Sequence, residues 1–523
     1  MQASIVLGAE PISIGDVVRV ARAAQPVEVA PAARERLVAA RRVVDAFASS
    51  STPIYGLNSA LGANTGQPLA PDDRAEYQRR AVRARAVGVG PAYDRASVRA
   101  MLFARAAGLR VGGSGASPAV LDALVAFLNR GVHPVVPRFG SISVADLPQL
   151  SHLALPLLGE GEAEVDGVVM PGAQALQRAE LAPLQLAAKD GLALISSNAA
   201  TVGRAALVLD DLRTLLAQWL TVVALSYEGF RANLGVLDAR AIDARPAPGQ
   251  AGVAQALRQQ LEGSALWQPG AARRLQDPVS LRCVAQVHGA ATWMMDEAIA
   301  QTQCELNSAA DSPLVLLKDG HDGHNDTDHV GDADSADIAD SAGAAMLSNG
   351  NFHIPALALA FDALALALTQ VTLMAVERAI KFMSPAFTEL PLQLTRHGPA
   401  HSGFATSQKT LTALANEVRQ RANPGSVDFL PVSERVEDHA PMALACIEKL
   451  AESIERARYV AAIEAVIAAQ AIDLRGTPVA SLGRGAAALY LRLRAEVEVL
   501  DADRPLGPDF ERACRLLRES SVA

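Results

Sequence analysis

The chain has 523 residues, of which half are hydrophobic and 4% are aromatic, and its formal net charge at pH 7 is −9. A negative balance of this size argues against general binding of nucleic acid or of acidic membranes. The length exceeds what one compact core usually supports, so two or more subregions are expected. The cysteines form no CxxC pair, which suits a reducing, cytoplasmic location. No basic segment followed by a long apolar run opens the chain, so no signal peptide is expected.

Three consecutive regions are predicted along the chain. Residues 1–200 alternate short helical segments with Gly- and Pro-rich loops, one of them at 51–66. Residues 201–475 are predicted to form a central bundle of long, nearly parallel helices, and residues 476–523 to form C-terminal helices. The fold class is therefore mainly α. The long apolar or amphipathic stretches are Thr201–Leu225, Val279–Leu306, Ile354–Met383, Ser407–Ala422 and Asp438–Ile472.

Two segments of the central region invite other interpretations. Residues 354–376 are apolar enough to resemble a membrane span, but Asp362 and Gln370 interrupt them, so a buried core helix and no membrane contact are expected. Residues 318–341 form an acidic insertion with three histidines, and a solvated loop is expected there. The histidine spacing fits neither an EF-hand nor a zinc finger, so no metal site is predicted. These histidines are His321, His324 and His329.

The most informative motif covers residues 140–152, Gly-Ser-Ile-Ser-Val-Ala-Asp-Leu-Pro-Gln-Leu-Ser-His. It resembles the prosthetic-group loop of the histidine and phenylalanine ammonia-lyases, which runs roughly Gly-Ser-Val-Gly-Ala-Ser-Gly-Asp-Leu. In that family, Ala-Ser-Gly cyclises with loss of two waters into methylidene-imidazolone (MIO), a built-in electrophile. Here the triad before Asp146 is Ser143-Val144-Ala145, and the loop is one residue shorter.

The changed residues predict that the electrophile is absent. The middle residue of the triad must lose a hydroxyl, and neither Val144 nor Ala145 carries one. The attacking amide belongs most easily to glycine, which has no Cβ to crowd the strained turn. The triad centred on Ser143 places a β-branched valine at that position instead. We therefore expect a degenerate MIO loop at 140–147 and no cofactor.

Further motifs extend the resemblance over nearly the whole chain, in the same order as in the aromatic amino acid ammonia-lyases and aminomutases. The chain is identified as a divergent member of this MIO-type family. The resemblance implies a histidine ammonia-lyase-like helical fold and a homotetramer whose sites are shared between subunits. It is weaker as an indication of the reaction. The motifs begin at Tyr55 (Tyr-Gly-Leu-Asn), Lys189 (Lys-Asp-Gly-Leu-Ala-Leu-Ile), Asp277 (Asp-Pro-Val-Ser-Leu-Arg-Cys), Glu305 (Glu-Leu-Asn-Ser), Gly350 (Gly-Asn-Phe-His) and Glu437 (Glu-Asp-His-Ala-Pro-Met).

Carried over by position, part of the family's site remains. Tyr55 falls where a lid tyrosine acts as the base, and Glu437 is a second candidate for proton transfer. Arg282 falls where an arginine holds the substrate carboxylate with its planar fork. Asn307 and Phe352 fall at pocket-lining positions.

Three other positions have changed. Val279 replaces a second tyrosine, Ser196 replaces an asparagine that supports the MIO, and Arg85 replaces a histidine that recognises the substrate ring. An added cation at Arg85 suggests a more anionic ligand.

The same residues also admit structural roles. Tyr55 could pack within its loop, Arg282 could pair with an acidic neighbour, Glu437 could be a satisfied core carboxylate, and Arg85 could form a surface salt bridge. Ser143 and Asp146 are expected to shape or cap the turn into the next helix rather than to catalyse. The same reasoning predicts that His152 and His439 are buried and hydrogen-bonded.

Three functions fit the sequence. The first, which we favour, is an MIO-independent lyase-like enzyme in which Tyr55 transfers a proton on a small carboxylated biosynthetic intermediate, by elimination, conjugate addition, isomerisation or cyclisation. Such a substrate would need an acidic C–H or a better leaving group than ammonium, because the electrophile carries the difficult part of deamination. The second is a non-catalytic homologue that binds a ligand or partners an active lyase. The third is an ammonia-lyase or aminomutase with an atypical MIO.

Overall fold

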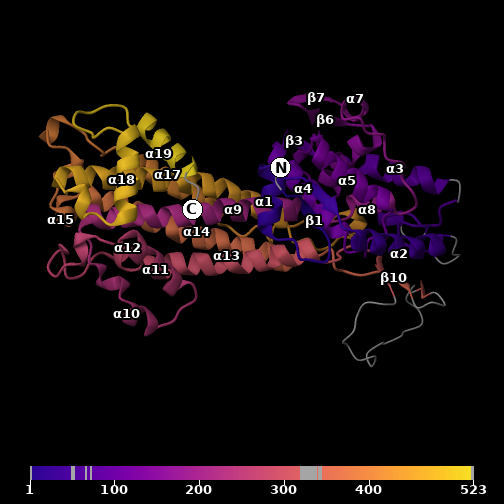
Figure 1. Cartoon of the computed structure of the whole chain (residues 1–523), viewed down its shortest axis with the longest axis horizontal. Helices are drawn as coiled ribbons and strands as arrows, with labels where there is room; N and C mark the ends of the chain where they lie inside the picture. Colours follow the sequence, from indigo (N-terminus) through magenta and orange to yellow (C-terminus); the bar gives the residue numbers. More distant parts are fainter. Residues whose placement is uncertain are drawn as a thin grey trace. The chain divides into compact units, whose positions relative to one another are not determined.

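The structure is a computed structural model that describes residues 3–48, 53–64, 67–70, 73–317, 338–339 and 344–519. This part of the chain is mainly α-helical, as the sequence predicts, with ten short strands (Figure 1). Almost all of the acidic insertion predicted at 318–341 lies outside the described residues, including its three histidines.

The chain divides into two compact units, and both are discontinuous in sequence. Unit 1 comprises Met1–Asp210, Ile299–Leu359 and Gly425–Ile447, and unit 2 comprises Asp211–Ala298, Ala360–Pro424 and Glu448–Ala523. This division does not follow the three consecutive regions expected from the sequence. The reason is that four long helices have residues in both units: α9 (Ala199–Phe230), α13 (Val284–Asn307), α14 (Pro355–Phe382) and α17 (Ala443–Arg475).

Unit 1 is built around a buried helix, α4 (Arg95–Leu109), which packs against α1 (Ile14–Arg22) and α5 (Pro118–Arg130). Helix α1 begins with a capping box, in which Ser13 and Asp16 each accept a hydrogen bond from the other's backbone N–H. Its buried residues recur with helical spacing and face α4. The other helices of this unit are α2 (Pro31–Ala48), α3 (Arg74–Arg85), α6 (Leu147–Ala154), α7 (Gly172–Arg178) and α8 (Asp190–Ile195).

The strands belong to unit 1 and form small sheets at its loops. One sheet pairs β1 (Ile5–Leu7) with β2 (Val27–Val29) in parallel, and a second pairs β3 (Val89–Ala92) with β5 (Pro137–Phe139) antiparallel. Strand β5 leads directly into the degenerate loop, and α6 follows it. The remaining sheets are β4-β6-β7 (His133–Pro134, Glu162–Val165, Val168–Pro171) and β8-β10-β9 (Leu314–Leu316, Ala345–Leu347, Ile338–Ala339).

Unit 2 has a charged centre inside an apolar helix bundle. Arg378 of α14 pairs with Glu464 of α17 at 2.6 Å, and both side chains are fully buried. Trp219 and Ser226 of α9 donate further hydrogen bonds to the same carboxylate. Donors on α9 and α14 therefore hydrogen-bond the Glu464 carboxylate. Such additional hydrogen bonds are what a buried ion pair needs to offset its desolvation. The shorter helices of this unit are α10 (Ala239–Asp243), α11 (Gln250–Gln260), α12 (Val279–Arg282), α15 (Pro385–Thr388), α16 (Ser407–Arg421), α18 (Arg484–Glu496) and α19 (Gly507–Glu519).

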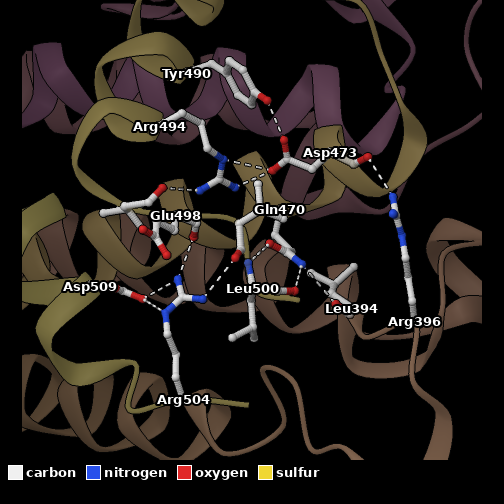
Figure 2. Close-up of polar contacts among 12 residues, drawn as sticks. Leu394, Arg396, Gln470, Asp473, Tyr490, Arg494, Glu498, Leu500, Arg504 and Asp509 are labelled. Atoms are coloured by element: carbon white, nitrogen blue, oxygen red, sulfur yellow. Dashed lines mark hydrogen bonds and ion pairs between the residues drawn. The ribbon is translucent and has the colours of Figure 1, made fainter. Parts of the chain in front are cut away.

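The C-terminal helices are joined to the bundle by polar contacts (Figure 2). Asp473, in the last turn of α17, accepts hydrogen bonds from Tyr490 and Arg494 of α18. Gln470, one turn earlier, exchanges hydrogen bonds with the backbone of Leu500. Arg504 then pairs with Asp509 in the first turn of α19. These contacts fix the end of the chain against α17.

Two apolar helical segments are long enough to cross a membrane by length and composition. In Asp190–Phe230, 94% of the most apolar window is buried inside the protein, which identifies a core helix. In Pro355–Phe382 only 56% of that window is buried. Three leucines of α14, at 359, 366 and 373, are 60%, 50% and 42% exposed. The buried helix expected at 354–376 is thus buried on one face only.

Candidate functional site

The degenerate loop has an unusual backbone. Ser143 and Ala145 have φ angles of 60° and 57°, in the left-handed region that side chains rarely occupy, and Gly140 has a φ of 143°. Ser143, Ala145 and Asp146 are all buried. Such a conformation persists only where surrounding contacts hold it in place, and the next residues supply those contacts.

Asp146 holds the loop to helix α9. Its carboxylate accepts hydrogen bonds from the Ser141 hydroxyl at 2.6 Å, the Thr201 hydroxyl at 2.8 Å and the Thr201 backbone N–H at 2.7 Å. Complete burial raises the pKa of Asp146, against the effect of these hydrogen bonds. Asp146 thus acts as a helix cap, as expected, but the helix that it caps is α9 and not α6. Asp146 precedes α6, yet its side chain makes no cap bond there and satisfies the first turn of α9.

Ser143 holds the loop to helix α17. Its Oγ accepts a hydrogen bond from the backbone N–H of Leu444 at 2.9 Å and lies 3.3 Å from the Thr201 hydroxyl. Its own backbone N–H donates to the Ser141 hydroxyl at 2.9 Å. The hydroxyl of Ser143 is therefore engaged in structural contacts.

Tyr55 lies in the lid loop with 37% of its surface exposed. Its hydroxyl accepts a hydrogen bond from the backbone N–H of Gly62 at 3.2 Å. Buried Gln78 links this loop to α8, because its amide donates to the Gly56 carbonyl and accepts from the Leu192 N–H, both at 3.2 Å. The phenol is thus held on an anchored loop with its ring partly open to solvent.

Glu437 lies close to the lid loop. It is partly buried, and its carboxylate accepts a hydrogen bond from Ser433 at 2.9 Å. The short helix Ser433–Arg435 contacts the short helix Gly62–Asn64, whose first residue is bonded to Tyr55. The structure therefore brings the two segments that carry the proton-transfer candidates together within unit 1.

Phe352 and its neighbour His353 lie directly against the degenerate loop. Asn198, which precedes α9, donates a hydrogen bond of 2.6 Å to the Phe352 carbonyl. Val144 pairs with His353 in an antiparallel bridge. His353 Nε2 lies 2.9 Å from Nδ1 of His439, and His439 is exposed, so the expectation that it is buried is wrong. His439 lies in the segment 431–439, where every side chain is exposed except Glu437, which is partly buried.

Arg85 and Ser196 are partly buried. The Arg85 guanidinium donates to the Ala81 carbonyl one turn earlier at 3.1 Å, and no carboxylate among the described residues pairs with it. The alternative of a salt bridge thus finds no support in this part of the chain. Ser196 ends α8, where its backbone N–H bonds to Leu192.

Asn307 is occupied with structural contacts at the end of α13. Its side-chain oxygen accepts from the Ile12 N–H at 2.7 Å and from Arg110 at 2.6 Å. Its side-chain nitrogen donates to the carbonyls of Ile12 and Gln303. All hydrogen-bonding positions of this amide are used, so the structure gives the predicted pocket residue a role in holding unit 1 together.

Arg282 and Val279 belong to α12 in unit 2. Tyr227 donates a hydrogen bond of 2.7 Å to the Leu281 carbonyl, and Arg378 donates one of 3.2 Å to the Ser280 carbonyl, so this short helix is held from both sides. Val279 is 58% exposed. Nε of Arg282 is buried without a hydrogen-bond partner among the described residues, and such a donor is suited to an anionic ligand.

Comparisons with known proteins identify the family. The family model for aromatic amino acid lyases matches residues 12–495. The chain belongs to the aromatic amino acid lyase family.

A histidine ammonia-lyase of Sorangium cellulosum is 39% identical over 98% of this chain and 97% of its own length. The structure of ergothionase from Treponema denticola, an ergothioneine-degrading enzyme, matches with a TM-score of 0.90 at 32% identity and covers 99% of each chain. Tyrosine aminomutase from Streptomyces globisporus matches with a TM-score of 0.88 at 29% identity, over 98% of this chain and 97% of the other. The expected histidine ammonia-lyase-like fold is confirmed.

The prosthetic group that this lyase family implies does not fit the residues present. Val144 has no hydroxyl to lose, Ala145 places a Cβ where glycine is required, and the Ser143 hydroxyl is bonded to Leu444. Sequence reasoning missed Asn198 and His353, although both follow recognisable motifs. An asparagine before a long apolar run is a helix-start signal, which could have indicated Asn198. His353 directly follows Phe352, which the sequence does predict as a pocket-lining residue.

Proposed function

We propose that this chain is an MIO-independent lyase that eliminates a tertiary amine from a betaine, an amino acid whose α-nitrogen is quaternary. The observation that carries the proposal is the loop itself, in which Val144 and Ala145 occupy the positions of the electrophile's precursors. A quaternary nitrogen has neither a lone pair nor an N–H, so it cannot add to an electrophile. A lyase for such a substrate has no use for the MIO.

Ergothioneine, the betaine of 2-thiohistidine, is the substrate we propose to test first. The ergothionase of Treponema denticola degrades it and matches this chain over 99% of both lengths. The thioimidazole ring carries anionic character, which suits Arg85 in place of a histidine. The ring also acidifies the neighbouring β-hydrogens, which lowers the demand on the base.

The chemistry then needs only this chain's own residues. The Tyr55 oxygen, acting as the base, takes the β-proton, and the C–H electron pair becomes the Cα=Cβ double bond. The Cα–N bond breaks, and its pair leaves on neutral trimethylamine. By the family resemblance, Arg282 holds the substrate carboxylate, and in this proposal Glu437 takes the proton from Tyr55 afterwards. A positioned general base of this kind contributes about 10²–10⁴-fold to the rate.

The experiment compares amine release from several substrates. We expect purified protein to release trimethylamine from ergothioneine, with a rise in ultraviolet absorbance as the conjugated acid forms, and to release no ammonia from histidine, phenylalanine or tyrosine. The Tyr55→Phe variant should slow the release by about 10²–10⁴-fold. Ammonia from histidine would overturn the proposal.

An ordinary histidine ammonia-lyase is the second candidate, because a relative carrying that name is 39% identical over almost the whole chain. Intact mass separates the two. An MIO would make the chain lighter than its translated sequence by two waters, and we expect no such loss. We also propose a homotetramer, as the family resemblance implies, and a cytoplasmic location, as the cysteine pattern suggests.

A further inference from the structure

A small cavity lies within unit 1, and it is lined by Asn198, which donates a hydrogen bond to the Phe352 carbonyl. Its walls include Arg105 of α4, Asn198 at the start of α9, Glu305 near the end of α13, and Asp311 in the segment that follows. Its volume is about 30 Å³. That is room for one or two waters.

Two buried polar atoms at this cavity have no partner among the described residues. Arg105 and Asn198 are 2% and 3% exposed. Arg105 donates through Nη2 to Asp311 at 2.7 Å and to the Ala193 carbonyl, but its Nε is unbonded. Asn198 donates through Nδ2 to Phe352, but its Oδ1 is unbonded. One donor and one acceptor are thus left unpaired in the wall of a polar space, a condition that buried groups rarely tolerate.

Glu305 supplies a third group. It is only partly exposed, and in the described part of the chain its carboxyl forms no hydrogen bond or ion pair. The other charged residues that line the cavity are Arg105 and Asp311, and these two are already paired with each other. No neighbouring cation is therefore free to neutralise Glu305.

We propose that ordered water fills this cavity and joins Glu305 to Asn198 and Arg105, which makes Glu305 a positioning residue for the candidate site. A water needs two to four polar partners to be held in a protein interior, and these three groups provide them. The role of the carboxyl is to complete the hydrogen bonding of Asn198, without contact to a substrate.

Asn198 connects the cavity to the candidate site. Its amide fixes the backbone of Phe352, and His353 pairs with Val144 of the degenerate loop. The preceding residue, Ser197, accepts the backbone N–H of Asp146 at 2.7 Å. A rotation of Asn198 would therefore disturb both Phe352 and the loop. This part of the argument rests on the proposed function, because it assumes that these residues line the pocket.

The protonation state of Glu305 determines whether its carboxyl can donate a hydrogen bond. Burial raises the pKa of Glu305 to about 7. Below that pH the protonated carboxyl donates one hydrogen bond and accepts others, whereas above it the carboxylate can only accept. Since Asn198 Oδ1 is an acceptor, the protonated carboxyl adds a donor to the network, and this donor is lost as the pH rises. We therefore expect the activity of the site to fall as the pH rises through the pKa of Glu305.

The test compares Glu305→Gln, which keeps the shape and a donor but cannot ionise, with Glu305→Leu, which removes both. Glu297→Gln on the exposed part of the same helix is the matched control. Crystals of the wild-type protein should show water between the three groups. Infrared difference spectra against Glu305→Gln should show a protonated carboxyl that titrates near pH 7. Glu305→Leu should lose the water and, at pH 6, about tenfold in kcat.

The outcomes separate this inference from the proposed function. Water in the cavity and a titrating carboxyl support the network even if ergothioneine is not a substrate, because neither readout depends on turnover. An empty cavity, or a Glu305 that is already ionised at pH 6, would overturn it. So would an unchanged pH profile of kcat in Glu305→Gln, given an active enzyme.

Discussion

The backbone N–H of Leu444 donates a hydrogen bond of 2.9 Å to the hydroxyl of Ser143, and both residues are buried. Leu444 lies in the first turn of α17, where backbone N–H groups have no partner within the helix. Beside it, the Met442 N–H donates to the Ile142 carbonyl at 3.2 Å. The Ser143 hydroxyl therefore stabilises the start of α17, although the loop that carries it resembles a catalytic loop.

The first prediction concerns this hydroxyl. Ser143→Ala should lower the free energy of unfolding by about 1–2 kcal/mol, because a buried N–H loses its acceptor. The intact mass of the wild type should equal that of its translated sequence, and the variant should differ only by the substituted atom. Ser402→Ala, on the exposed surface, is the control for stability. A wild type lighter by two waters, with the loss reversed in Ser143→Ala, would make Ser143 a precursor of the electrophile.

The second prediction tests the base. Tyr55→Phe should reduce kcat/KM by about 10²–10⁴-fold. The melting temperature should change little, since the ring is partly exposed and loses one hydrogen bond of 3.2 Å. The measurement is amine release under saturating and limiting ergothioneine. Tyr459→Phe, which removes a hydroxyl bonded to Glu511 in unit 2, should leave the rate unchanged. If Tyr55→Phe turns over ergothioneine as fast as the wild type does, Tyr55 is not the base.

The third prediction tests the anion-binding position. Arg282→Lys should raise KM by about 10–100-fold with a smaller change in kcat, because an ammonium keeps the charge but cannot form the bidentate contact with a carboxylate. The buried, unbonded Nε of Arg282 is the structural reason. Arg240→Lys, at a residue paired only with Asp238 on the surface, is the matched control. If KM is the same in Arg282→Lys and wild type, the carboxylate is held elsewhere.

The fold could be predicted well from the sequence because long apolar stretches leave few alternatives to buried helices. Thr201–Leu225 lies within α9, and Ser407–Ala422 matches α16 to within one residue. Local backbone geometry explains the differences. The stretch from Val279 breaks at Cys283 into α12 and α13, and α17 begins at Ala443 rather than 438 because Met442 has a φ of 52°.

The candidate site could be predicted only in part, because its contacts join residues far apart in the chain. Nothing near Asp146 in sequence indicates that it caps α9 through Thr201, 55 residues away. Asn307 looks like a pocket residue by position, yet its contacts reach Ile12, 295 residues away. Polar side chains are interpreted correctly only when their partners are known, and partners are a property of the fold.

The fourth prediction concerns acid stability. His288 is fully buried at the edge of Trp219, and burial, with the nearby charge of Arg378, lowers its pKa to about 3. Between pH 3 and 6.5 the unfolded chain therefore binds a proton that the folded chain does not, so this contribution to stability is lost as the pH falls below 6.5. At about 1.4 kcal/mol per pH unit, the loss by pH 5 is about 2 kcal/mol.

Denaturant unfolding at pH 7, 6 and 5 measures this effect. His288→Phe keeps a ring beside Trp219 without a titrating group, so its stability should fall by about 2 kcal/mol less than that of the wild type over this range. His397→Gln, at an exposed histidine, should behave as the wild type does. Parallel pH dependences in His288→Phe and the wild type would mean that His288 is charged inside the fold.

The fifth prediction concerns assembly. Leucines 359, 366 and 373 recur every seven residues on α14, so they share one face of the helix, and all are substantially exposed. An apolar row of this length is expected to be covered by another subunit. Leu366→Arg should therefore convert the proposed homotetramer into smaller species, measured by light scattering after gel filtration. Leu491→Arg, at a similarly exposed leucine of α18, should leave the mass of the assembly unchanged. If the wild type elutes as a monomer, the exposed row must be covered by something other than a second copy of the chain.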